Sequence, residues 1–157
     1  MNIALMLIFF TTVQGFAQVR TVKIEALTSL LNNDVDSIYV MNFWATWCKP
    51  CIEELPFFEE AHVTFADKNV KVILVSLDSP SELDRVLLPF IKKKNITSEI
   101  LLLDESNPNS WIDKIEKKWT GSLPATIIQH NRTKKRLFFE QQLEKEQLFT
   151  TIQSLLE

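Results

Sequence analysis

The feature that most constrains the fold is an apolar run that leads directly into a pair of cysteines. Residues 37–45 (SIYVMNFWA) are rich in aromatic and β-branched side chains, which is typical of a buried strand. Cys48 and Cys51 follow at once, and residues 48–65 then carry apolar side chains at helical spacing. The two cysteines are therefore expected where a strand ends and a helix begins.

Strand-like and helix-like segments alternate along the rest of the chain. Strands are expected over 70–77, 99–103, 125–130 and 135–140, and helices over 81–93, 111–119 and 145–156. Pro89 should kink the first of these helices. The connection of about 24 residues between the first two strands favours a parallel pair, and the short turn at 131–134 favours an antiparallel hairpin. The sequence thus predicts an α/β fold with a mixed central sheet and helices on both faces.

Composition indicates one ordinary globular domain. The chain has 157 residues, of which 46% are hydrophobic and 24% charged, and its net charge is −3. A chain of this length buries a core without disulfide staples, and two cysteines are too few for a disulfide scaffold. The charge gives no footprint for nucleic acid and argues against an anionic membrane surface as the main partner. The cysteine pair is therefore expected to serve chemistry rather than stability.

The N-terminal segment has the pattern of an export signal. Residues 3–10 form an unbroken apolar run, too short for a bilayer span of about 20 residues, and Gly15 and Ala17 suit cleavage after Ala17. No lysine or arginine precedes the run, and a buried first strand or an uncleaved anchor are the alternatives. We predict a signal peptide over 1–17, a mature domain over 18–157, and a periplasmic or otherwise exported location.

A cysteine at the N-terminus of a helix has unusual chemistry. Backbone N–H groups are unpaired there and the helix dipole favours negative charge, so a thiolate on Cys48 is stabilised. Two intervening residues let Cys51 fold back to within bonding reach. Pro50 fits the first helical turn, and Lys49 adds a positive charge. The pattern predicts a redox-active dithiol.

Three other interpretations of the cysteine pair are weaker. A structural bridge that closes so small a loop restrains the unfolded chain little. A zinc site would need a second pair of ligands, and His62 and His130 are not spaced as partners. Covalent haem attachment would need a histidine where Ile52 stands. No metal and no bound cofactor is therefore expected.

Residues 42–51 (NFWATWCKPC) resemble the active-site segment of the thioredoxin superfamily. The next residues, 52–56 (IEELP), resemble its TlpA/ResA-like branch of extracytoplasmic reductases, which act in cytochrome c maturation and envelope thiol chemistry. The resemblance covers nearly the whole mature chain in the order of elements, and it is specific in residues 42–56 and 121–126. It implies a thioredoxin fold and thiol–disulfide oxidoreductase activity.

Glu54 is the candidate proton acceptor. It lies three residues after Cys51, and helical spacing keeps it near the same side as both cysteines. From spacing alone it could equally be a solvated surface residue, like Glu53. The resemblance assigns it the role of accepting the Cys51 proton. Asn42 stands where thioredoxin itself has a buried aspartate, so that other proton acceptor is absent.

Residues 121–126 (GSLPAT) resemble the cis-proline loop that faces the cysteines in this superfamily. The resemblance implies a cis bond before Pro124. It also implies that main-chain groups of Leu123 bind an extended substrate in the manner of strand addition. Trp47 is expected to be exposed beside the cysteines and to shape the surface that meets a partner, whereas Trp44 is expected in the core.

These features together predict a dithiol reductase of exported proteins, with a monomer as the default state. Its partners would be disulfide-containing protein substrates and a membrane electron donor that reduces the enzyme again. An oxidase or isomerase of the same fold stays open, because Lys49-Pro50 does not set the redox direction. A thioredoxin-fold copper chaperone also stays open, although such relatives space their cysteines more widely and add a histidine. A thiol peroxidase is disfavoured, because no proline–threonine framework precedes Cys48.

Overall fold

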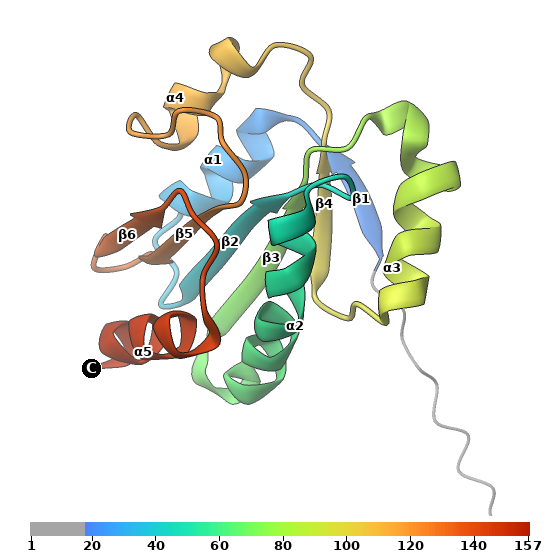
Figure 1. Cartoon of the computed structure of the whole chain (residues 1–157). Helices are drawn as coiled ribbons and strands as arrows, with labels where there is room; N and C mark the ends of the chain where they lie inside the picture. Colours follow the sequence, from blue (N-terminus) through green and yellow to red (C-terminus); the bar gives the residue numbers. More distant parts are fainter. Residues whose placement is uncertain (1–17) are drawn as a thin grey trace, which may run out of the picture.

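A six-stranded mixed sheet forms the centre of the computed structural model, which describes residues 18–157 (Figure 1). The predicted signal peptide, residues 1–17, lies outside the described residues. In spatial order the strands are β1 (Val19–Val22), β4 (Glu99–Leu103), β3 (Val70–Ser76), β2 (Ile38–Trp44), β5 (Ala125–His130) and β6 (Arg136–Phe139). Neighbours from β1 to β2 pair in parallel, and β5 and β6 add antiparallel pairs. The predicted mixed sheet and closing hairpin are confirmed.

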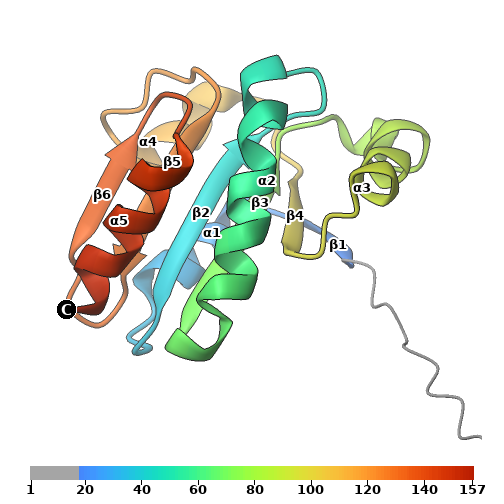
Figure 2. The ribbon, with the colours of Figure 1, turned by 60° about the horizontal axis from the view of Figure 1, so that its bottom comes forward.

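Helices pack on both faces of the sheet, as predicted. They are α1 (Ile24–Asn32), α2 (Lys49–Thr64), α3 (Leu88–Lys94), α4 (Ile112–Ile115) and α5 (Lys145–Leu156). Buried side chains of α2, α3 and α5 share one core cluster, and those of α1 and α4 share another. Figure 2 shows α2 and α5 on one face of the sheet and α1 on the other. None of the helices between residues 18 and 157 is both long and apolar enough to cross a membrane.

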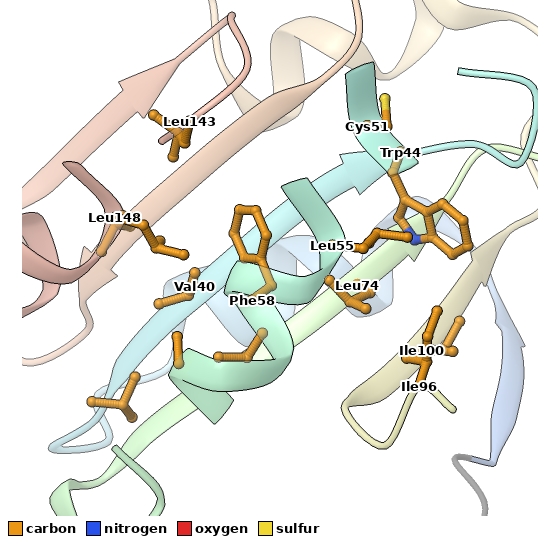
Figure 3. Packing of buried hydrophobic residues seen from close by; sticks show 14 of the residues in the cluster. Val40, Trp44, Cys51, Leu55, Phe58, Leu74, Ile96, Ile100, Leu143 and Leu148 are labelled. Atoms are coloured by element: carbon orange, nitrogen blue, oxygen red, sulfur yellow. The ribbon is translucent and has the colours of Figure 1, made fainter. Parts of the chain in front are cut away.

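Strand β2 is buried along its whole length because both of its faces are covered. Val40 and Trp44 pack under α2, whereas Met41 and Phe43 join the cluster beneath α1. Figure 3 shows Phe58 of α2 among the side chains of the first cluster. Burying a side chain of this size contributes about 2 kcal/mol. This packing fixes the end of β2, from which the cysteines follow.

The predicted helix over 81–93 is helical in the structure, but its hydrogen-bond pattern changes along its length. A short 3₁₀ turn (Pro80–Glu82) and a π-helical turn (Leu83–Leu87) precede α3. The backbone stays helical at Leu87 and Leu88, where the π-helical turn passes into α3, so Pro89 lies just after a π-helical turn within one helical segment. A proline in a helix interior has no backbone N–H to donate, and the hydrogen-bond pattern departs from that of an α-helix in the π-helical turn before Pro89.

The predicted helix over 111–119 is only one turn, α4, preceded by a 3₁₀ turn at Pro108–Ser110. Trp111 and Trp119 are both buried, and their rings meet edge to face with centroids 5.4 Å apart. A continuous helix would separate their Cα atoms by about 12 Å. The chain leaves the helix at Glu116, which is extended, and this allows the two indoles to pack together.

Candidate active site

Cys48 and Cys51 form a disulfide at the N-terminus of α2. Cys48 is the N-cap residue, and its Sγ accepts a hydrogen bond from the Cys51 N–H at 3.3 Å. Cys48 retains 6% of its surface exposed, whereas Cys51 is fully buried. The predicted placement of the pair between a strand and a helix is confirmed. Cys48 is consequently the sulfur that a thiolate from outside can reach.

A buried carboxylate, Asp78, holds the loop between β2 and α2. It accepts hydrogen bonds from the Thr46 N–H at 3.1 and 3.2 Å, from the Thr46 hydroxyl at 2.6 Å and from the Ser76 hydroxyl at 2.7 Å. Asp78 follows β3, the parallel neighbour of β2, so the two strand ends are tied together just before the cysteines.

We expect Asp78→Ala to destabilise the oxidised protein by about 3 kcal/mol, because it leaves the buried Ser76 hydroxyl and the half-buried donors of Thr46 without an acceptor. The free energy of unfolding in urea measures this effect. Asp84→Ala is the matched control, since Asp84 is exposed and makes no side-chain hydrogen bond within residues 18–157. Equal stabilities of the two variants would contradict the role given to Asp78.

A cleft of about 830 Å³ opens beside the disulfide. Its lining comes from the cysteine loop, the ends of β3 and β4, the segment before α4 and the loop before β5: Trp47, Cys48, Lys49, Pro50, Leu77, Asp78, Ser79, Pro80, Leu103, Asp104, Glu105, Ser106, Pro108, Trp111, Gly121 and Leu123. Trp47 has 69% of its surface exposed, as predicted. Trp44 is fully buried, which was also predicted. The cleft therefore offers an apolar surface next to the reachable sulfur.

Glu54 is fully buried one turn along α2 from Cys51. Its Oε1 accepts a hydrogen bond from Asn42 Nδ2 at 2.8 Å, and its Oε2 accepts one from the Leu143 N–H at 2.7 Å. Burial raises the pKa of Glu54 to about 7, although both hydrogen bonds act to lower it. The alternative of a solvated surface residue is wrong. The carboxyl can exchange a proton near neutral pH.

Asn42 is a polar residue in the otherwise apolar interior of β2. Its Nδ2 also donates to Thr126 Oγ1 at 3.0 Å, so the amide bridges α2 and β5. Its Oδ1 has no hydrogen-bond partner among the described residues. Asn42 thus places a neutral group that donates a hydrogen bond beside the Glu54 carboxyl.

The loop of residues 120–124, here called the proline loop, contributes Gly121 and Leu123 to the lining of the cleft. The Leu123–Pro124 peptide bond is cis, as predicted. Gly121 has a φ of +97°, a backbone conformation that residues with a Cβ rarely adopt. Trp119 Nε1 donates to the Ser122 carbonyl at 2.9 Å. Cys48 and Leu123 thus line one cleft although they are remote in sequence.

The structure adds two contacts that sequence analysis missed. The Leu143 N–H reaches Glu54 across 89 residues, and the Glu140 carboxylate reaches the proline loop across about 20. No sequence signal indicates either contact. Within residues 18–157, no three His, Cys, Asp or Glu side chains gather in an arrangement that could hold a metal ion.

Comparison with known proteins places these features in a family. ResA, a thiol-disulfide oxidoreductase of Oceanobacillus iheyensis, is 40% identical over 58 residues, which are 37% of this chain and 29% of ResA. The sporulation thiol-disulfide oxidoreductase A of Bacillus subtilis is 33% identical over 63 residues, 40% of this chain and 38% of that protein. The matched segments therefore span well under half of these relatives.

Solved structures share the fold over most of the chain. A thioredoxin-related protein from Neisseria meningitidis superposes with a TM-score of 0.66 at 19% identity, covering 77% of this chain and 86% of that one. A thiol:disulfide interchange protein from Chlorobium tepidum gives 0.65 at 16% identity, covering 83% and 85%. The predicted thioredoxin fold is confirmed. The model of the AhpC/TSA family matches residues 17–134, so this chain belongs to the AhpC/TSA family of the thioredoxin superfamily.

Proposed function

We propose that this protein is a thiol–disulfide oxidoreductase that reduces disulfides of exported proteins through Cys48 and Cys51. The observation that carries the proposal is the disulfide at the start of α2, which opens on the same cleft as the proline loop. Glu54 supports it, because a buried carboxyl with a pKa near neutrality lies one turn along the same helix.

The reaction begins from the reduced protein. The Cys48 thiolate, stabilised at the helix N-terminus, attacks one sulfur of a substrate disulfide. A mixed disulfide forms, and the other substrate sulfur leaves as a thiolate that takes a proton from water. Cys48 Sγ is then bonded to the substrate.

The second step releases the substrate. Cys51 gives its proton to the Glu54 carboxylate and attacks Cys48 Sγ. The Cys48–Cys51 disulfide forms, and the second substrate sulfur leaves and is protonated. Two electrons pass from the dithiol to the substrate. A second dithiol must reduce the enzyme again, and we assign that role to a membrane electron donor.

The substrate would lie in the cleft. Main-chain groups of Leu123 would pair with an extended substrate segment, while Pro124 contributes no N–H and leaves the approach to Cys48 open. The exposed indole of Trp47 would pack against apolar substrate side chains. Unfolded or extended segments around a disulfide fit such a surface better than a folded one.

Export would deliver the protein to disulfide-containing partners. The support for export is the apolar run of residues 3–10 with small residues at Gly15 and Ala17, followed by the domain. We infer a periplasmic or otherwise extracytoplasmic location on this pattern.

Two measurements test the proposal. The reduced protein should reduce insulin in the presence of dithiothreitol, and Cys48→Ala should not accelerate the reaction. Equilibration with glutathione should give a reduction potential closer to about −270 mV, as in thioredoxin, than to about −120 mV, as in DsbA. A potential above about −150 mV would overturn the reducing direction, and a wild-type rate equal to that of Cys48→Ala would overturn the activity.

A further inference from the structure

The carboxylate of Glu140 binds the proline loop from outside it. Glu140 directly follows β6. Its Oε1 accepts hydrogen bonds from the Thr120 N–H at 3.0 Å, the Thr120 hydroxyl at 2.5 Å and the Ser122 N–H at 2.9 Å, and its Oε2 lies 3.1 Å from the Thr120 nitrogen. One side chain thus accepts from two main-chain N–H groups and one hydroxyl of the same short loop.

These hydrogen bonds do much to hold the proline loop in one conformation. Thr120, Gly121 and Ser122 are exposed, so they have little buried apolar surface to hold them. The other side chain that anchors them is Trp119, through the Ser122 carbonyl. Gly121 and Leu123 of this loop line the cleft beside Cys48. The Glu140 carboxylate therefore holds residues that line the cleft, although Glu140 itself does not line it.

Glu140 has no basic partner at ion-pair distance within the described part of the chain. Partial burial acts to raise the pKa of Glu140, but the donors of Thr120 and Ser122 outweigh it and the pKa is lowered. The carboxylate therefore stays ionised near neutral pH and keeps its hold on the loop.

We propose that Glu140 is a positioning residue that pre-organises the proline loop for protein substrates, an inference that rests on the proposed function. A loop held in its binding conformation does not have to be ordered when a substrate segment pairs with it. The sulfur chemistry of Cys48 and Cys51 does not involve Glu140. Its loss should weaken binding of a protein disulfide and leave the exchange step unchanged.

Single-turnover kinetics of the reduced protein separate the binding of a protein disulfide from the exchange step. Glu140→Ala should raise the half-saturating concentration of insulin about five- to tenfold, with the maximal rate unchanged. The rate with hydroxyethyl disulfide, which is too small to need the loop, should not change. Glu140→Gln keeps one carbonyl acceptor and should restore part of the affinity. Glu144→Ala, at an exposed carboxylate of the same segment without a side-chain cap hydrogen bond, is the control.

Two outcomes would overturn the role of Glu140. Half-saturation equal to that of the wild type would show that the loop does not depend on this carboxylate. A parallel loss with both disulfides would show a general structural defect. Amide hydrogen exchange of the oxidised protein gives a second readout, since Thr120 and Ser122 should exchange about tenfold faster in Glu140→Ala. A wild type that reduces neither disulfide would instead refute the proposed function.

Discussion

A Cys51→Ala variant is expected to stop after the first exchange step and to retain its substrate on Cys48 as a mixed disulfide. Cys51 is fully buried directly behind Cys48, so no solvent thiol occupies its place when it is removed. Turnover should fall to the uncatalysed background, while covalent capture of insulin chains by the reduced variant should be visible as a mass increase that dithiothreitol reverses.

The matched control is Cys48→Ala, which should capture nothing, because its remaining thiol is sealed inside the protein. Capture by Cys48→Ala and not by Cys51→Ala would reverse the roles of the two sulfurs and contradict the mechanism. The Cys51→Ala variant also identifies natural partners when it is produced in the original cell and its disulfide-linked complexes are analysed by mass spectrometry.

Glu54→Gln should slow the release of the mixed disulfide by about 100-fold at pH 7, because a positioned proton acceptor typically contributes at least this factor. Formation of the mixed disulfide by Cys48 should change much less. Rapid mixing with a thiol-blocking quench resolves the two steps. Glu53→Gln is the control, since Glu53 is an exposed carboxylate on the same helix. Equal rates for the two variants would contradict a role for Glu54.

The same Glu54→Gln substitution should alter the pH dependence of stability. The pKa of Glu54 is about 7 in the folded protein and 4.5 in the reference state, so the folded state binds this proton more tightly. Its contribution to stability is full below pH 4.5 and is lost as pH rises through 7. The difference in pKa corresponds to about 3 kcal/mol.

Urea unfolding of the oxidised protein at pH 4.5 and pH 8 measures this change. The stability of the wild type relative to Glu54→Gln should fall by about 3 kcal/mol between the two pH values. Glu53→Gln should show no such change against the wild type. A constant difference between the wild type and Glu54→Gln would show that the carboxyl titrates alike in both states.

The sequence pattern predicted those parts of the site whose structure depends on residues close together in the chain. The strand at 37–45 and the helix after it were predicted from contiguous residues, and the cis bond at Pro124 was predicted from the resemblance of residues 121–126 to the cis-proline loop. The spacing of Glu54 from Cys51 was also visible, but its burial was not. Burial depends on α5 and the segment before it, which close over α2 from the far end of the chain.

Elements whose support comes from distant residues escaped prediction. Helix α1 begins after Lys23, which makes no side-chain capping contact, and the Ile24 N–H is accepted instead by Glu105, 81 residues away. Such a start carries none of the usual N-cap residues. Strand β1 has only four residues, half of them exposed, and pairs with β4 alone. Periodicity over so short a segment is too weak to distinguish a strand.

The contact between Leu143 and Glu54 uses a main-chain donor. Every amino acid except proline supplies the same N–H, so this hydrogen bond does not depend on which side chain stands at residue 143. The affinity of Glu54 for its proton thus depends partly on the backbone path between β6 and α5, which brings this N–H to the carboxyl. An insertion or deletion in the segment after β6, far from the cysteine motif, would change the pKa of Glu54 while every motif residue stays the same.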